Sequence, residues 1–167
     1  MTQSEEDKLE VMKIALEEGR KGLADQDKTI NSIRQRSMWI GGLAGVIAAF
    51  LGREALDVSP IANLTLCVDS IALVVGFAAL FVTYAAIINV MRPHKGLKFH
   101  NSPGLVISQF TDPENPATLT EIHEALAGFS EENYICNQKI LSRLFLSLLV
   151  AAIAMIVEFI AWLTVLA

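Results

Sequence analysis

The stretch SIALVVGFAALFVTYAAIINVM, residues 70–91, decides the fold, because its 22 residues include no charged side chain. At ~1.5 Å per residue, a helix of this length measures roughly 33 Å, which is enough to cross the ~30 Å hydrocarbon core of a bilayer. Pro93 follows at once and cannot continue a helix. We therefore predict a transmembrane helix that ends near Met91, and its start is expected at either Ile61 or Ser70.

The composition of the whole chain agrees with a lipid environment. The 167 residues are 53% hydrophobic and only 19% charged, and the mean hydropathy is +0.46. A net charge of -5 gives no electrostatic reason to expect nucleic-acid binding. The lipid bilayer is the predicted partner, and the fold class is all-α with three transmembrane helices.

Two further spans flank the central one. The first is expected at 37–56, although its uncharged core, 38–52, would measure only roughly 22 Å as a helix. Either Arg53 reaches the far interface or the membrane thins locally, and a re-entrant segment remains an alternative. The first two spans form a hairpin over 37–91, and the third span covers 144–167.

The N-terminal segment, 1–36, is predicted to be a long cytoplasmic amphipathic helix. Its apolar residues recur at intervals of three, four or seven: Leu9, Met12, Leu16, Leu23, Ile30 and Ile33. Gly19 and Gln26 interrupt this stripe where a dimerising zipper requires apolar side chains. We therefore expect the helix to lie against neighbouring helices or the membrane surface.

The segment between the second and third spans, 92–143, is predicted to be cytoplasmic and partly helical. It opens with a proline-rich loop, and Thr118 with Glu121 then forms a capping-box pattern at a helix start. Gly128 suggests a bend, beyond which one helix should continue into the third span. The protein thus has a helical cytoplasmic layer.

Small residues recur at helical spacing on two of the spans. Those on the first span are Gly41, Gly45, Ala48 and Gly52, and those on the third are Ser147, Ala151, Ala154 and Ala161. Such faces allow close helix packing. Three spans, two of which carry such faces, have little to enclose within one short chain, so we also predict a homo-oligomer.

Glu158 falls on the small-residue face of the third span, about 15 residues or roughly 22 Å from its cytoplasmic end. Ionisable residues at this depth are costly to insert and mark functional sites. Two interpretations stay open: an ion pair between Glu158 and Arg53, or a ring of Glu158 side chains that lines an oligomeric pore or a water-filled seam.

No catalytic or metal-binding pattern is present. The three histidines and two cysteines fit no metal-ligand spacing, and the glycines of the first span do not form a phosphate loop. The chain is therefore not expected to be an enzyme, and no cofactor or metal is predicted. Arg92, Lys95 and Lys98 are weak candidates for a small ligand, but contact with lipid headgroups is the better interpretation.

Three short segments resemble one known family. They are Leu23–Lys28 (LADQDK) before the first span, Met91-Arg92-Pro93 after the second, and the polar helix Tyr134–Arg143 that leads into the third. This arrangement resembles the Pycsar transmembrane effectors and the related SLATT proteins of bacterial cyclic-nucleotide anti-phage defence.

The resemblance implies an inner-membrane effector that oligomerises or opens on a cyclic-nucleotide signal and impairs membrane integrity. A cyclic nucleotide would then be a ligand, although the sequence has no obvious separate domain to bind it. The alternatives are a constitutive small ion channel, or a membrane scaffold or sensor that recruits a cytoplasmic protein.

Lys and Arg are distributed unevenly between the spans, with seven before the first, one between the first two and five between the second and third. By the positive-inside rule, the N-terminus is cytoplasmic and the C-terminus lies outside. Single cysteines at Asp57 and Asp112, in a chain without its native cysteines, test this topology. An impermeant thiol reagent added to intact cells should label position 57 and spare position 112, and equal labelling of both would contradict three spans.

Overall fold

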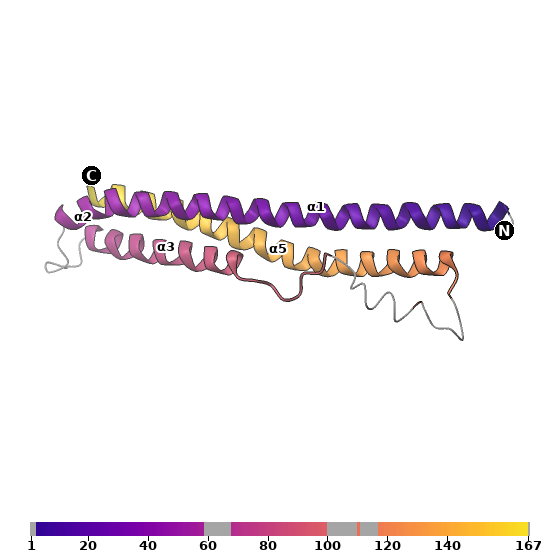
Figure 1. Ribbon diagram of the computed structural model, residues 1–167. Coiled ribbons are helices and arrows are strands. Elements are labelled where there is room, and N and C mark those ends of the chain that lie inside the picture. The colour runs from indigo at the N-terminus through magenta and orange to yellow at the C-terminus, as the bar shows by residue number, and fades with distance from the viewer. Residues whose placement is uncertain (1–2, 59–67, 100–109, 111–116, 167) are drawn as a thin grey trace. The chain divides into compact units, whose positions relative to one another are not determined.

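A computed structural model describes residues 3–58, 68–99, 110 and 117–166, and within these residues all regular structure is helical. The elements in chain order are α1 (Gln3–Ile47), the π-helical turn η1 (Ala48–Gly52), α2 (Arg53–Val58), α3 (Val68–Met91) and α5 (Leu119–Leu166) (Figure 1). Three of the helices, over Glu5–Leu56, Ser70–Met91 and Leu119–Leu166, are long and apolar enough to cross a membrane. The predicted all-α class is confirmed for the described chain.

The helices run further than the predicted segments. α1 continues without a break from the expected cytoplasmic helix into the first span, and α5 passes through Gly128, so the bend expected there does not interrupt the helix. α3 begins at Val68, between the two predicted starts of the second span. Residues 59–67 between the first two spans and most of the proline-rich loop lie outside the described residues.

The chain divides into two compact units. Unit 1 comprises Met1–Ile30 and His94–Ser142, and unit 2 comprises Asn31–Pro93 and Arg143–Ala167. α1 and α5 therefore each contribute their first part to unit 1 and their second part to unit 2. Each unit has its own set of contacts.

In unit 1, α1 packs along α5 through the two residues that interrupt its apolar stripe. A Cβ atom placed on Gly19 would lie 2.9 Å from the Cβ of Ser130, so only glycine permits this approach. One heptad later, Gln26 Nε2 donates a hydrogen bond of 3.0 Å to the carbonyl oxygen of Tyr134. Both contacts advance in the same direction along the two helices, so α1 and α5 are parallel. Gly19 and Gln26 thus fit a different helix of the same chain.

A short strap, residues 94–99, closes onto α5 in the same unit. The buried Asn137 side chain accepts a hydrogen bond from the backbone N–H of Lys98 at 3.0 Å and donates one to its carbonyl oxygen at 2.9 Å. An amide that pairs with both backbone groups of one residue replaces two bonds that the strap would otherwise make to water. Asn137 therefore fixes the strap by hydrogen bonds, and Ile140 of α5 packs against Gly96 of the strap.

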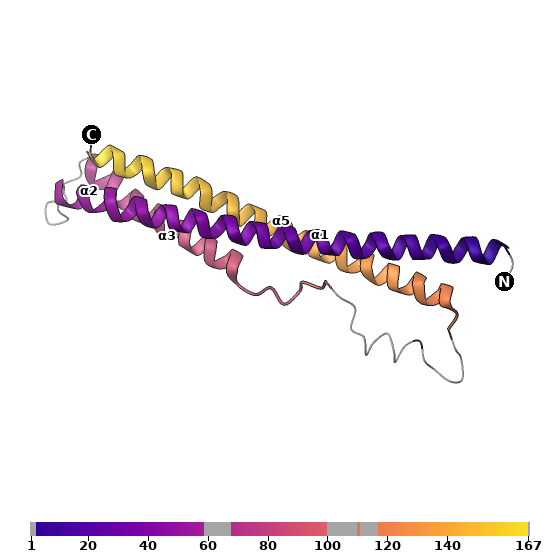
Figure 2. The ribbon, with the colours of Figure 1, turned by 45° about the horizontal axis from the view of Figure 1, so that its top comes forward.

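In unit 2, α3 runs antiparallel to both other helices. Tyr84 donates a hydrogen bond of 3.1 Å to the Gly41 carbonyl oxygen, and Ile87 lies against Gly41 one turn further along α3. Asn89 Nδ2 donates to Ser147 Oγ at 2.9 Å on the opposite neighbour. Figures 1 and 2 both show α3 beside α1 in this unit.

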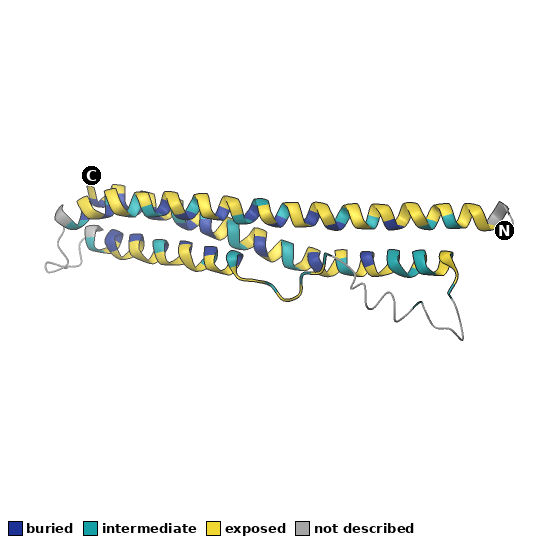
Figure 3. Ribbon diagram, in the orientation of Figure 1, coloured by how far each residue is buried: buried dark blue, intermediate teal, exposed yellow. Residues whose placement is uncertain are grey.

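The surface of unit 2 is apolar, and its interior combines apolar side chains with small and polar ones. The large side chains of Trp39, Phe50 and Phe81 are 74%, 71% and 77% exposed, while Ser37 and Thr83 are fully buried. Both buried hydroxyls donate to carbonyl oxygens of their own helix at 2.9 Å. Figure 3 shows the exposed residues along the outer faces of the helices. Water would disfavour this arrangement, and a lipid solvent accommodates it.

The capping box at the start of α5 is confirmed. Glu121 Oε2 accepts hydrogen bonds of 2.8 Å from both the backbone N–H and the hydroxyl of Thr118, whose Oγ1 accepts from the Glu121 N–H at 3.3 Å. The backbone bond and then the hydroxyl bond hold the pKa of Glu121 below its ordinary value of 4.5.

The cap therefore depends on pH, because a carboxyl with a depressed pKa stabilises the helix above its ordinary pKa and loses this effect as the pH falls through the depressed value. Hydrogen-exchange protection of the amides of 119–122, corrected for intrinsic rates, should fall in this acidic window. Glu121→Gln should abolish the pH dependence. Equal protection of the wild-type amides at pH 6 and pH 3 would show that the cap does not stabilise the N-terminal end of α5.

Candidate functional site

Glu158 is the ionisable residue that the structure buries most completely within a membrane-length helix. It lies on the part of α5 that belongs to unit 2 and has 0% of its surface exposed, even with no lipid around the protein. The buried residues Ala151, Ala154 and Ala161 share its helix face. The carboxyl therefore points into the bundle of its own chain.

One oxygen of this carboxyl has a partner and the other does not. Trp162 Nε1 donates a hydrogen bond of 3.3 Å to Glu158 Oε1 from one turn further along α5. Glu158 Oε2 is buried and has no hydrogen-bond partner among the described residues. A buried polar atom without a partner costs about 1–3 kcal/mol, so the helix packing around Glu158 must offset this penalty.

Trp162 occupies a gap that two glycines provide. A Cβ atom on Gly76 of α3 would lie 3.0 Å from the indole ring, and one on Gly52 of η1 would lie 3.5 Å from it. The ring of Phe77 meets the indole edge-on, with centroids 5.1 Å apart and planes at 89°, a favourable aromatic geometry. The indole, which belongs to α5, thus contacts both α3 and η1. Trp162 is also a member of the core cluster, which comprises Ala55, Ala72, Leu73, Trp162 and Val165.

The helix opposite Trp162 is not a regular α-helix. η1 widens the backbone over Ala48–Gly52 and returns to an α-helix at Arg53. Single π-helical turns are uncommon and often occur at functional sites. Here the turn ends at Gly52, which lies against the indole, so the irregular backbone, the indole and the buried carboxyl form one layer of unit 2.

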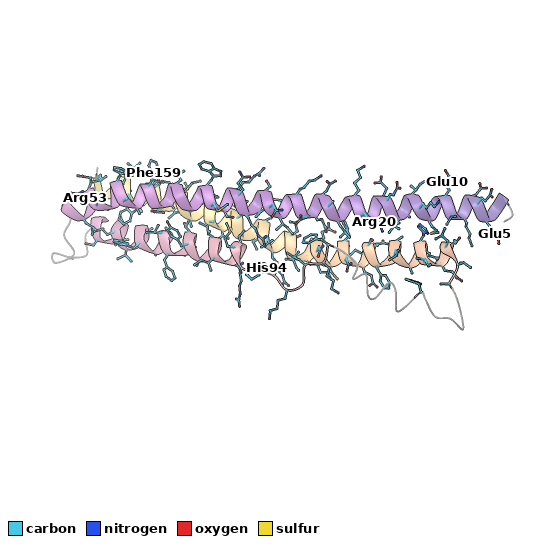
Figure 4. All side chains as sticks on the ribbon, viewed as in Figure 1. Glu5, Glu10, Arg20, Arg53, His94 and Phe159 are labelled. Carbon is cyan, nitrogen blue, oxygen red and sulfur yellow. The ribbon has the colours of Figure 1, made fainter. Side chains whose placement is uncertain are left out.

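Arg53 does not pair with Glu158. Its side chain is exposed at the start of α2 (Figure 4), and the two ion pairs found among described residues, Lys21–Glu18 and Lys28–Asp25, involve neither residue. An exposed guanidinium and a fully buried carboxyl cannot share the dry contact that the ion-pair interpretation requires. The partner of Glu158 is an indole that sequence reasoning did not single out.

The other candidate residues lie apart from this layer. Arg92, Lys95 and Lys98 have exposed side chains, and the bonds of Lys98 to Asn137 use its backbone. No cluster of three metal-ligating side chains occurs among the residues that the structure describes. Among the predicted packing residues, Gly41 and Gly52 are buried against Ile87 and Trp162, as described above.

Among the described residues, the layer of Glu158, Trp162 and η1 contains one carboxyl, so the chemistry that it offers is that of a single acid. A buried carboxyl within a span can bind a cation or exchange a proton once water reaches it. The sequence signal that could have identified the partner is the spacing, because Trp162 follows Glu158 by one helical turn on the same face.

No protein-family model, curated protein or solved structure matches the chain.

The Trp162 contact predicts which glycine of unit 2 tolerates a side chain. Gly76→Val would force the indole out of the gap between α3 and η1, because even a Cβ atom would lie 3.0 Å from the ring. Gly42→Val is the matched control, since nothing lies within 4 Å of a Cβ atom there. The melting temperature of the purified protein in mild detergent should fall by several degrees for Gly76→Val and stay unchanged for Gly42→Val. Equal melting temperatures would show that the indole is not tightly held.

Proposed function

We propose that the chain is a multi-pass inner-membrane effector that impairs membrane integrity on a cyclic-nucleotide signal, as its resemblance to the Pycsar and SLATT effectors implies. One observation supports this best: a carboxyl with an unpartnered oxygen, Glu158, buried inside a bundle of membrane-length helices. A structural protein gains nothing from such a residue, since an apolar side chain would pack there at lower cost.

The described conformation is the closed state in this proposal. Glu158 is inaccessible to solvent and Trp162 fills the space beside it, so an ion path needs a rearrangement that withdraws the indole from Gly52 and Gly76. A carboxyl exposed in this way would favour cations. The N-terminus and unit 1 are cytoplasmic, the C-terminus lies outside, and Arg92, Lys95 and Lys98 contact anionic headgroups at the inner surface.

Membrane potential in bacterial cells that express the chain tests the proposal. With a potential-sensitive dye, depolarisation should appear when a cyclic pyrimidine or purine nucleotide is supplied and be absent without it. Depolarisation without any nucleotide would identify a constitutive channel, and none with any nucleotide would favour a scaffold that recruits a protein.

Glu158→Gln should assemble normally and lose most of the depolarisation, because the amide keeps the shape but not the charge. Arg53→Gln is the control, since Arg53 is exposed and makes no contact with the carboxyl. Full depolarisation by the Glu158→Gln protein, at normal expression and stability, would remove Glu158 from the mechanism.

A further inference from the structure

Unit 1 has an open groove of about 410 Å³ between α1 and α5. Small residues line most of it: Ala15, Gly19, Gly22, Ala127, Gly128 and Ser130. Such a floor allows a third helix to come close, and Tyr134 with the two glutamates Glu18 and Glu131 forms the remaining walls.

The rim of the groove is acidic. Glu131 lines it together with Glu18, which pairs with Lys21 at 3.7 Å, and Glu124 lies on the same face of α5 as Glu131, seven residues earlier. All three side chains are exposed. This rim would repel a phosphate group, so a cyclic nucleotide is a poor occupant, and a helix with a basic face is a good one.

α1 carries two cations on one side, which we call its basic face, and the exposed Glu17 lies one helical turn from each of them. Lys13 and Arg20 are exposed and seven residues apart, so they share one side of the helix (Figure 4 labels Arg20). Ile14 beside them is 56% exposed, and this apolar side chain has no role within a single chain. In the heptad pattern of α1, Lys13 and Arg20 flank the buried seam on the side opposite to Ala15 and Gly22, which line the groove. The basic face of one chain therefore cannot reach its own acidic rim.

The register of unit 1 places the two faces at matching levels. The close approach of Gly19 to Ser130 sets α1 beside α5, so Arg20 lies level with Glu131, the next residue on each helix. One heptad earlier, Lys13 lies level with Glu124. Copies that enter one membrane in the same direction are related by an axis normal to that membrane, so equivalent residues of neighbouring copies lie at equal heights. Two oppositely charged pairs then meet at once.

We propose that the groove of unit 1 is the docking surface for α1 of a second copy of this chain, with Arg20 and Lys13 of one copy facing Glu131 and Glu124 of the next. The contact joins two different faces, so repetition closes a ring of copies around the membrane normal. Ile14 of the incoming helix packs toward the small-residue floor. The inference rests on the common membrane orientation of the proposed function and names the surface through which such an effector assembles.

Charge reversal tests this surface with the full chain in lipid nanodiscs, by native mass measurement without any nucleotide. The wild type should be oligomeric. Arg20→Glu should weaken assembly by at least about tenfold, because it places like charges opposite each other at every contact. Lys28→Glu is the matched control with the same change in net charge, and its side chain pairs only with Asp25 of its own helix, at 3.0 Å. The double variant Arg20→Glu with Glu131→Arg should assemble again.

Co-expression of differently tagged Arg20→Glu and Glu131→Arg chains gives an independent measure, because each supplies the face that complements the other. Mixed oligomers should be recovered while either variant alone stays dissociated, with unchanged helicity by circular dichroism. A monomeric wild type, an intact Arg20→Glu oligomer, or no recovery in both the double variant and the mixture would overturn the proposal. Assembly is measured apart from depolarisation, so an oligomer that never depolarises cells would contradict the proposed function alone.

Discussion

One buried face of α5 organises the described structure. Its fully or nearly fully buried residues recur every seven positions: Ser130, Asn137, Leu144, Ala151, Glu158 and Val165. A strict seven-residue repeat keeps one side of a helix against its neighbours and is typical of left-handed helix pairs. α5 uses this face in unit 1 against α1 and the strap, and in unit 2 against η1 and α3. The same helix geometry therefore serves both units.

The chemistry along this face differs between the two units. In unit 1 the polar members are satisfied locally, Ser130 by the Leu126 carbonyl oxygen and Asn137 by the backbone of Lys98. In unit 2 alanine allows close packing, since apolar burial gives no net driving force between helices in lipid. Glu158 is the exception, because its second oxygen is left without a partner. Gln26 Oε1, buried where α1 meets α5, also has no partner, so Glu158 is distinguished by carrying an ionisable group within a membrane-length helix.

Several features could be predicted because they depend on local sequence. The capping box at Thr118 follows from two side chains within one turn, and the apolar length of α3 follows from composition alone. In a zipper of identical helices, Gly19 and Gln26 would interrupt the apolar stripe. Against α5 they are matched residues, since glycine admits Ser130 and the amide reaches the Tyr134 carbonyl oxygen. The partner helix is remote in sequence, so periodicity alone could not identify it.

By itself, the sequence determined that the chain forms long helices of membrane length and that Glu158 lies on a face of small residues. These properties follow from composition and from the 3.6-residue turn of a helix. Only the tertiary structure decided what that face meets: Trp162, held between Gly52 and Gly76, is the partner of Glu158, and Arg53 is exposed. The helical period fixes which residues share a face. The choice of neighbouring helix depends on shape complementarity between segments that are far apart in the chain, because a seven-residue repeat is compatible with many such neighbours.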